Sequence, residues 1–470
     1  MRAKQFIFLT VMTLGILTGV EAQDAITMNM KDCMRYAVEH SAKMRIQQVD
    51  NRDAQIDRRN AILTAFTPSI SGSTYAYANF GRSIDPETNT YSTVTSFHNG
   101  YSISAGITLF NGFQAVNNIK IAKTAQQMGL TQTQQLEDQL CLATIEAYCS
   151  VLYYTELEKV LAEQVSTAEA SLRLVEKQEQ MGQKSHIDVV QLQADLSKCR
   201  YRLTTCHNSL NNALVTLKDV MFWPVNEPMK IDDSVPFLTG LSTPDSTTIS
   251  VGLSHCGSRI TPTEDVSMLV NHAKQWLPKV VLAKGAITNA RLALKTARWQ
   301  VAPSLSLNGG WSSSYFTYPG QQGYRSVPFP EQIRNNGGEY VQLSLNIPIY
   351  SHLAIFSNIE KRKNELKRAS ARYEQVVQEV EAEVQRAVAD RDAAAEALQE
   401  AVLRASLQGE SLELNRKRFE QGAISTVEYR TISDDYLTAV AEQLNARLQY
   451  FIKDYIVRYY AGERQLTVDN

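Results

Sequence analysis

The chain has 470 residues, and its 47 basic and 49 acidic side chains leave a formal net charge of −2 at pH 7. A charge this close to zero excludes the strongly basic surface of a nucleic-acid-binding protein. The 6 cysteines form no CxxC pair and the 7 histidines are scattered, so we expect no metal centre. Export permits a disulfide, but a long helical protein does not need one, so we expect the cysteines to be core residues. The phosphate-binding glycine-lysine loop and the dinucleotide fingerprint are missing from the sequence, which predicts neither an enzyme nor a bound cofactor.

Residues 1–22 have the pattern of a secretory signal peptide. Arg2 and Lys4 precede an apolar stretch, and Val20 and Ala22 supply the small residues of a cleavage site. The apolar stretch is short for a membrane anchor, so we predict export and cleavage after Ala22. The rest of the sequence has no apolar run of spanning length. The exported chain is therefore either soluble or inserted as β-strands, whose alternation escapes a hydropathy search.

Residues 23–223 predict a helix, a β-hairpin and then long helices. Asn29 followed by Asp32 resembles a helix start, and this helix is expected to continue to Phe66, before Pro68. Alternating residues predict strands over 69–80 and 101–109, and the polar residues between them, about 81–99, predict a loop.

Residues 268–460 repeat this order. Pro68-Ser69-Ile70-Ser71 recurs as Pro303-Ser304-Leu305-Ser306, and Gly182-x-x-Ser185-x-x-Asp188 recurs as Gly422-x-x-Ser425-x-x-Glu428. Strands are predicted over 305–311 and 341–347, with a loop over about 314–338. A repeat of this length is too long for a solenoid, so it indicates one large unit made twice.

The helical stretch after each hairpin has apolar and small residues at a spacing near 3.5, as in coiled coils. Residues 224–267 are rich in Pro, Ser, Thr and Asp and are interpreted as a connector lying outside the helices. Residues 461–470 are a C-terminal tail.

Each predicted strand is about ten residues long, the length of a tilted membrane strand, and aromatic residues gather near the strand ends. A soluble antiparallel sheet with one wet face alternates equally well. Four strands cannot close a barrel, and open edges are not tolerated in lipid. In a membrane, several copies must therefore share a barrel, and three copies would supply twelve strands.

Taken together, the ordered motifs resemble the TolC family of outer-membrane efflux and export channels over essentially the whole exported chain. The resemblance rests on the Met28–Ala37 helix start, on Trp276-Leu277-Pro278, on the two Pro-Ser-x-Ser segments, on Leu109-Phe110-Asn111-Gly112 and Ile349-Tyr350-Ser351-His352, and on the two Gly-x-x-Ser turns.

This resemblance implies a homotrimer in the outer membrane of a Gram-negative bacterium. It implies an α+β membrane protein: a shared twelve-stranded barrel, a long α-helical barrel through the periplasm, and an equatorial belt. It also implies outer-membrane lipid, a periplasmic adaptor and an inner-membrane pump of the RND or ABC class as partners. A passive exit duct for efflux is the leading interpretation; a duct for type I protein secretion and a periplasmic coiled-coil scaffold are the alternatives.

The resemblance also assigns the site residues. Glu428 would face the periplasmic constriction of the pore, with Asp188 as its first-half counterpart. Gly182, Ser185, Gly422 and Ser425 would form the helix-tip turns where the adaptor docks. Phe419 stands where the family can have a tyrosine that makes closing contacts, Ile424 where some members have an arginine, and Thr431 where a second acidic ring is possible. A plainer interpretation is that Asp188 and Glu428 only cap their helices.

Overall fold

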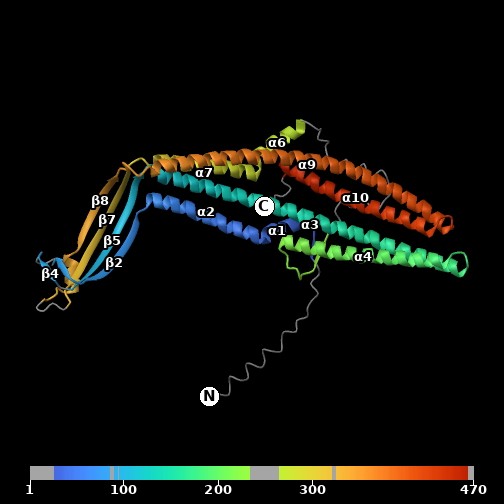
Figure 1. The fold of residues 1–470 in the computed structure, drawn as a ribbon, viewed down its shortest axis with the longest axis horizontal. Helices are drawn as coiled ribbons and strands as arrows, with labels where there is room; N and C mark the ends of the chain where they lie inside the picture. Colours follow the sequence, from blue (N-terminus) through green and yellow to red (C-terminus); the bar gives the residue numbers. More distant parts are fainter. Residues whose placement is uncertain (1–25, 85–88, 94, 233–263, 320–323, 464–470) are drawn as a thin grey trace, which may run out of the picture. The chain divides into compact units, whose positions relative to one another are not determined.

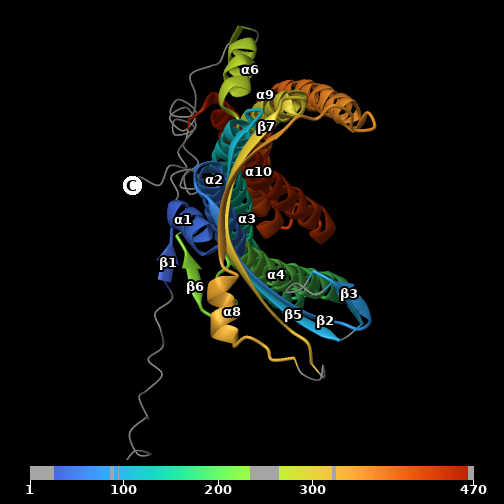
Figure 2. The ribbon, with the colours of Figure 1, turned by 90° about the vertical axis from the view of Figure 1, so that its left-hand side faces the viewer.

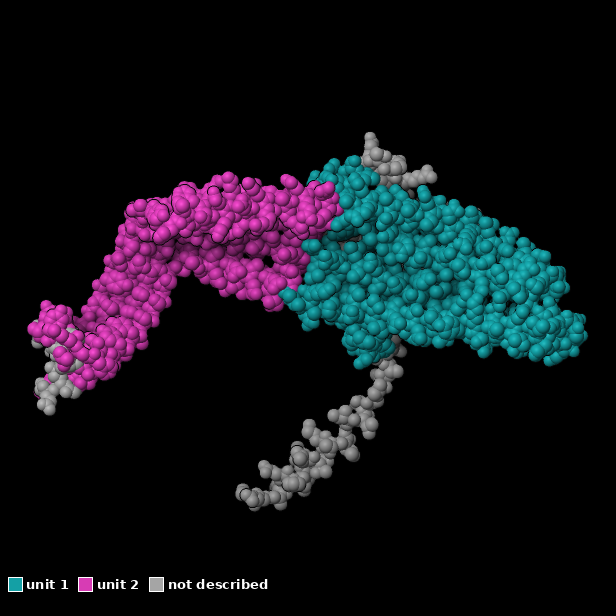
Figure 3. Space-filling model, viewed as in Figure 1, with its two compact units in different colours: residues 1–46, 134–276, 380–470 teal, residues 47–133, 277–379 magenta. Residues whose placement is uncertain are grey.

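We describe the protein from a computed structural model that covers residues 26–84, 89–93, 95–232, 264–319 and 324–463. The chain divides into two compact units, coloured separately in Figure 3. Unit 1 comprises Met1–Ile46, Gln134–Trp276 and Val380–Asn470, and unit 2 comprises Gln47–Thr133 and Leu277–Glu379.

Each half of the chain has two helices, then two strands of the main sheet, then two long helices, with different short elements between them (Figure 1). In the first half, α1 (Met30–His40) and α2 (Ala42–Phe66) precede the strands, and α3 (Gln114–Gln180) and α4 (His186–Met221) follow them. In the second half, the corresponding helices are α6 (Glu264–Trp276), α7 (Pro278–Trp299), α9 (Ala354–Glu420) and α10 (Thr426–Ala461). Helices α3 and α9 both have 67 residues, and α4 and α10 both have 36.

The cores of unit 1 form between helices. In one cluster, Tyr148 and Val151 of α3 pack with Leu217 and Met221 of α4 and with Cys33 of α1. All five described cysteines are buried free thiols. Burial, with smaller contributions from nearby carboxylates, raises the pKa of Cys33, Cys141 and Cys149 to about 12, so these side chains are unreactive packing residues.

Part of the predicted connector joins this core. Strand β6 (Met229–Ile231) pairs in parallel with β1 (Ile26–Met28), and the Tyr148 hydroxyl donates a 2.7 Å hydrogen bond to the Asp232 carbonyl. The remainder of the connector, up to residue 263, lies outside the described residues, as do the predicted signal peptide and residues 464–470 of the tail.

Unit 2 contains an antiparallel sheet with the strand order β2-β5-β7-β8 (Figures 1 and 2). Its strands are β2 (Ser69–Asn79), β5 (Ser96–Asn111), β7 (Ser304–Thr317) and β8 (Gly338–Asn346). Both edge strands, β2 and β8, have one side without a partner strand within the described part of the chain. Among the described residues, no helix is both long and apolar enough to cross a membrane.

The register gives this sheet two different faces. The apolar face includes Ile70, Ile103, Leu307, Val341 and Leu343, which lie in matching layers on the four strands. Val341 is 83% exposed and Ile70 is 73% exposed, so this face has no cover over much of its area. The serine-rich face includes Ser71 opposite Ser104 and Ser73 opposite Ser102, with hydroxyl–hydroxyl distances of 3.1 and 2.7 Å.

Three boundaries predicted from the sequence are wrong. The single helix expected from Asn29 to Phe66 is broken at Ser41, which has φ −58° and ψ 128° and whose hydroxyl accepts from the Lys43 N–H. The loop predicted over 81–99 contains the hairpin β3 (Arg82–Ile84) and β4 (Tyr91–Thr93) and the start of β5. Strands β3 and β4 have three residues each, and the start of β5 is polar, so none of them shows the alternation of apolar and polar residues that predicts a strand.

The loop predicted over 314–338 contains the end of β7, the start of β8 and the helix α8 (Phe329–Asn335). A buried side chain holds this helix to the sheet. Gln332 accepts a hydrogen bond from the Phe316 N–H and donates to the carbonyls of Phe316 and Val327, at 2.9 to 3.0 Å. The Ser313 hydroxyl also donates to the Ile333 carbonyl, and the Phe329 ring contacts the rings of Tyr101 and Tyr315. A short helix held by tertiary contacts has no signature in local sequence, which explains the error.

Candidate functional site: the paired helix turns

The candidate site lies in unit 1, where α3 turns into α4 and α9 turns into α10. Gly182 and Gly422 have φ values of +70° and +73°, in the left-handed region that favours glycine. The Gly182 and Gln183 N–H groups bond to the carbonyls of Glu179 and Gln178, and Gly422 and Ala423 bond in the same way to Phe419 and Arg418. Both long helices therefore end in the same Schellman motif.

The helix after each turn begins with a serine cap. The Ser185 hydroxyl accepts from the Ile187 N–H at 3.1 Å, and the Asp188 carboxylate accepts from the Ser185 N–H at 3.2 Å. These two bonds form a capping box, as the spacing predicts. The Ser425 hydroxyl caps α10 by accepting from the Glu428 N–H at 3.2 Å.

The two acidic residues of the turns have different surroundings. Asp188 is half-buried, and its second oxygen accepts a 2.8 Å hydrogen bond from the Thr426 hydroxyl of the other turn. Glu428 is exposed, and its carboxylate makes no hydrogen bond or ion pair with another described residue. Asp188 is thus used to join the two turns, whereas Glu428 is a free negative charge at the start of α10.

Beneath the turns lies a small apolar core that involves all four helices. It comprises Val175 of α3, Val189 and Leu192 of α4, Phe419 at the end of α9, Ile424 and Tyr429. The Phe419 and Tyr429 rings stack at 4.6 Å with an interplanar angle of 8°. Phe419 is only 3% exposed, so the structure places this predicted gate residue, together with Ile424, inside the core of one chain.

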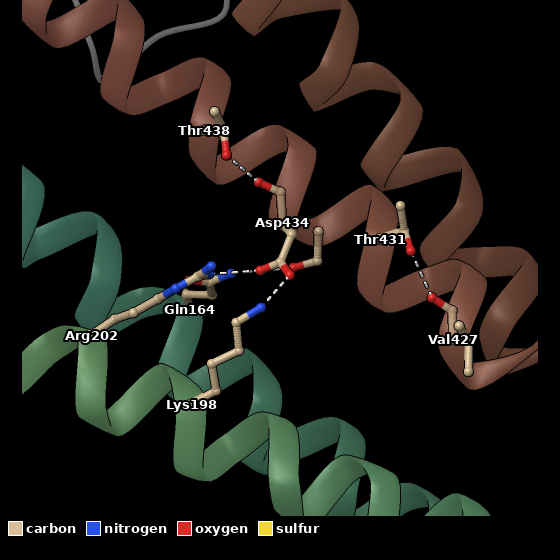
Figure 4. A network of polar contacts seen from close by, with 8 residues as sticks. Gln164, Lys198, Arg202, Val427, Thr431, Asp434 and Thr438 are labelled. Carbon is tan, nitrogen blue, oxygen red and sulfur yellow. Dashed lines mark hydrogen bonds and ion pairs between the residues drawn. The ribbon is translucent and has the colours of Figure 1, made fainter.

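A network of charged side chains joins α4 to α10 further from the turns (Figure 4). Asp434 accepts from Lys198 at 2.7 Å and from Arg202 at 2.6 Å. Burial by itself raises the pKa of Asp434, but these two hydrogen bonds and charges outweigh it and hold the pKa below its ordinary value. For the neighbouring Asp195, burial and the charge of Asp434 raise the pKa.

Sequence reasoning did not identify Thr426, Lys198, Arg202 or Asp434. Lys198 and Arg202 do carry a signal, because a spacing of four places both on one face of a helix. Their partner lies far away in the sequence, so the pairing itself was not readable. Thr431 bonds through its hydroxyl to the Val427 carbonyl of its own helix. In the part of the chain that the structure describes, no cluster of metal-ligating side chains is found.

Comparison with known proteins assigns the family. The sequence model of the outer membrane efflux protein family matches residues 40–221 and 269–455, which together make up most of the chain. The chain therefore belongs to the outer membrane efflux protein family. No curated protein matches the sequence.

Solved structures of channels have the same fold. The structure of CusC covers 93% of this chain and 92% of its own at 15% identity, with a TM-score of 0.75. The match to the Campylobacter jejuni CmeC outer membrane channel covers 92% of this chain and 86% of the CmeC chain at 16% identity, with a TM-score of 0.70. The match to the open state of the Neisseria gonorrhoeae MtrE outer membrane channel covers 92% of this chain and 88% of the MtrE chain at 14% identity, with a TM-score of 0.70.

Proposed function

We propose that this protein is the passive outer-membrane exit duct of a tripartite efflux system. The observation that carries the proposal is the exposed apolar face of the four-stranded sheet, in a chain of the outer membrane efflux protein family. In water, so much uncovered apolar surface is unfavourable, at about 25 cal/mol per Å². Facing hydrocarbon, the same side chains are in their preferred environment, and the serine-rich face is then turned to a wet lumen.

The open edges of the sheet support an assembly of several copies. In lipid, unpaired N–H and C=O groups along β2 and β8 would each cost several kcal/mol. Pairing β2 of one copy with β8 of the next removes both edges. Three copies then close a barrel of twelve strands, which is within the range of known membrane barrels. The duct is accordingly a homotrimer.

The helices of unit 1 support the same assembly. Leu403, Leu407 and Leu414 of α9 are each more than half exposed, at a spacing that places them along one stripe. An apolar stripe of this kind needs a helix of another chain as cover. We propose that these stripes join the three copies into an α-helical tube that continues the barrel.

The paired turns form the periplasmic end of this tube. Three copies of the exposed Glu428 around one axis would attract cations and repel anions at the narrowest point. The turns around Gly182, Ser185, Gly422 and Ser425 would meet a periplasmic adaptor, and through it an inner-membrane pump of the RND or ABC class. Asp188 would add a second carboxylate to the constriction, held in place by the 2.8 Å hydrogen bond that the Thr426 hydroxyl donates to it.

The test is the oligomer mass and the single-channel conductance of the full-length protein, extracted in detergent and placed in a planar bilayer. We expect a trimer that gives discrete current steps favouring cations. A protein that is soluble without detergent and carries no current would remove the duct and favour a periplasmic coiled-coil scaffold. Transport of an unfolded protein instead of small molecules would favour a duct for type I secretion.

A further inference from the structure

Four rings form a continuous surface at one end of the serine-rich face. Tyr77 on β2, His98 on β5 and Phe316 on β7 are direct neighbours in the register. The Tyr77 and His98 rings stack at 4.9 Å and 13°, and His98 stacks on Phe316 at 6.4 Å and 27°. Tyr75 extends this aromatic row by stacking on Tyr77 at 6.1 Å and 14°.

Gly100 on the neighbouring strand β5 makes room for the ring of Tyr75, at one end of the row. Gly100 lies opposite Tyr75, and a Cβ atom at Gly100 would come within 2.4 Å of the Tyr75 ring. The tyrosine therefore lies over a gap in the side chains of β5, with its ring against the sheet. Tyr75 and Tyr77 remain 59% and 51% exposed. Rings that only stabilised a soluble core would be covered, whereas these present free surface.

The charge around the row is also unusual. Glu339 is the only charged residue in the four strands, and its partner Trp311 places it on the apolar face. Apart from His98, the four strands therefore place no acidic or basic side chain on the serine-rich face, and the electron-rich ring faces are the strongest partners for a cation there.

We propose that the aromatic row is a contact site for planar aromatic cations that pass through the duct. This inference rests on the proposed function, because the serine-rich face lines the lumen only if the apolar face meets lipid. Stacking provides contact with any flat ring, and the ring quadrupole adds attraction for positive charge. In a trimer the row would occur three times around the lumen, within the β-barrel.

The test measures how strongly two cations block the channel current. Both are added to the side of the bilayer on which the β-barrel opens. Ethidium is planar and aromatic, and tetraethylammonium has the same charge without rings. We expect ethidium to block at the lower concentration. In Tyr77→Ser, the half-blocking concentration of ethidium should rise about fivefold, the effect of losing one cation–π contact. Tyr77→Phe keeps a ring and should retain the block, and Tyr350→Ser, an exposed tyrosine outside the row, is the matched control.

Each other outcome has a defined meaning. Equal block by the two cations, an unchanged ethidium block in Tyr77→Ser, or an equal loss in Tyr350→Ser would overturn the aromatic site while leaving the duct intact. A wild-type protein that carries no current in any condition would overturn the proposed duct, and the inference with it.

Discussion

The Thr426 hydroxyl donates a 2.8 Å hydrogen bond to the Asp188 carboxylate, and this bond joins the first turn of α10 to the first turn of α4. The same carboxylate closes the capping box of α4 through its other oxygen. One side chain therefore fixes a helix start and ties the two halves of the chain together at their turns. Thr426 is buried, which strengthens the bond relative to one in water.

Replacement of Thr426 by valine keeps the shape of the side chain and removes this hydrogen bond. We expect Thr426→Val to lower the free energy of unfolding by about 1 kcal/mol, measured as a lower thermal midpoint of the detergent-solubilised protein. Thr431→Val is the matched control, because the Thr431 hydroxyl is exposed and bonds only within its own helix. Equal midpoints for the two variants would show that the link between the turns contributes no stability.

The free carboxylate of Glu428 should act on ions and not on folding. In a salt gradient across a planar bilayer, we expect Glu428→Gln to shift the reversal potential towards zero, because the proposed constriction then loses the charge of Glu428. Glu428→Asp keeps the charge and should keep the selectivity. A reversal potential that is the same in all three proteins would contradict a pore position for this residue.

The turn glycines are required by backbone conformation and not by space. No heavy atom lies within 4 Å of an added Cβ at Gly182 or Gly422, yet both have positive φ. We expect Gly182→Ala and Gly422→Ala each to cost about 1 kcal/mol of stability, visible in thermal unfolding. Gly338→Ala also enters open space but at an ordinary φ, so its midpoint should stay near that of the wild type.

The network around Asp434 predicts opposite pH effects for two neighbouring acids. Asp434 has a lowered pKa when folded, so its ionised form stabilises the fold at neutral pH. This contribution is lost only as the pH falls below the ordinary value of 3.8 and through the folded pKa. Asp434→Asn should therefore lower the thermal midpoint at pH 7, and the difference from wild type should vanish in strong acid.

Asp195 has a raised pKa when folded, so its ionised form destabilises the fold at neutral pH. Asp195→Asn should raise the midpoint at pH 7, and this gain should shrink as the pH falls and wild-type Asp195 takes up its proton. Asp435→Asn, an exposed change on α10, serves as the control for both variants. At pH 7 the thermal midpoint should lie below that of the wild type for Asp434→Asn and above it for Asp195→Asn. Midpoints that differ from the wild type with the same sign in both variants would contradict the assigned network.

Much of this architecture was readable from the sequence because it depends on local periodicity and on turn chemistry. Alternation predicted the four strands of the sheet, and the Gly-x-x-Ser spacing predicted both helix turns and the capping box at Ser185. Positive φ and N-cap geometry are properties of a few adjacent residues, so the residue types alone specify them. The resemblance to the family could be recognised for the same reason, because it rests on short motifs that follow one another in a fixed order along the sequence.

Only the tertiary structure decided which distant residues meet. It buries Phe419 against Tyr429 within one chain, gives Asp188 a partner in Thr426, and leaves Glu428 without one. Strand register was likewise needed to bring Tyr77, His98 and Phe316 into one row. Such contacts join residues on different helices or strands, and Asp188 and Thr426 are 238 positions apart. Their energy depends on the packing of whole elements, which no local pattern of residues encodes.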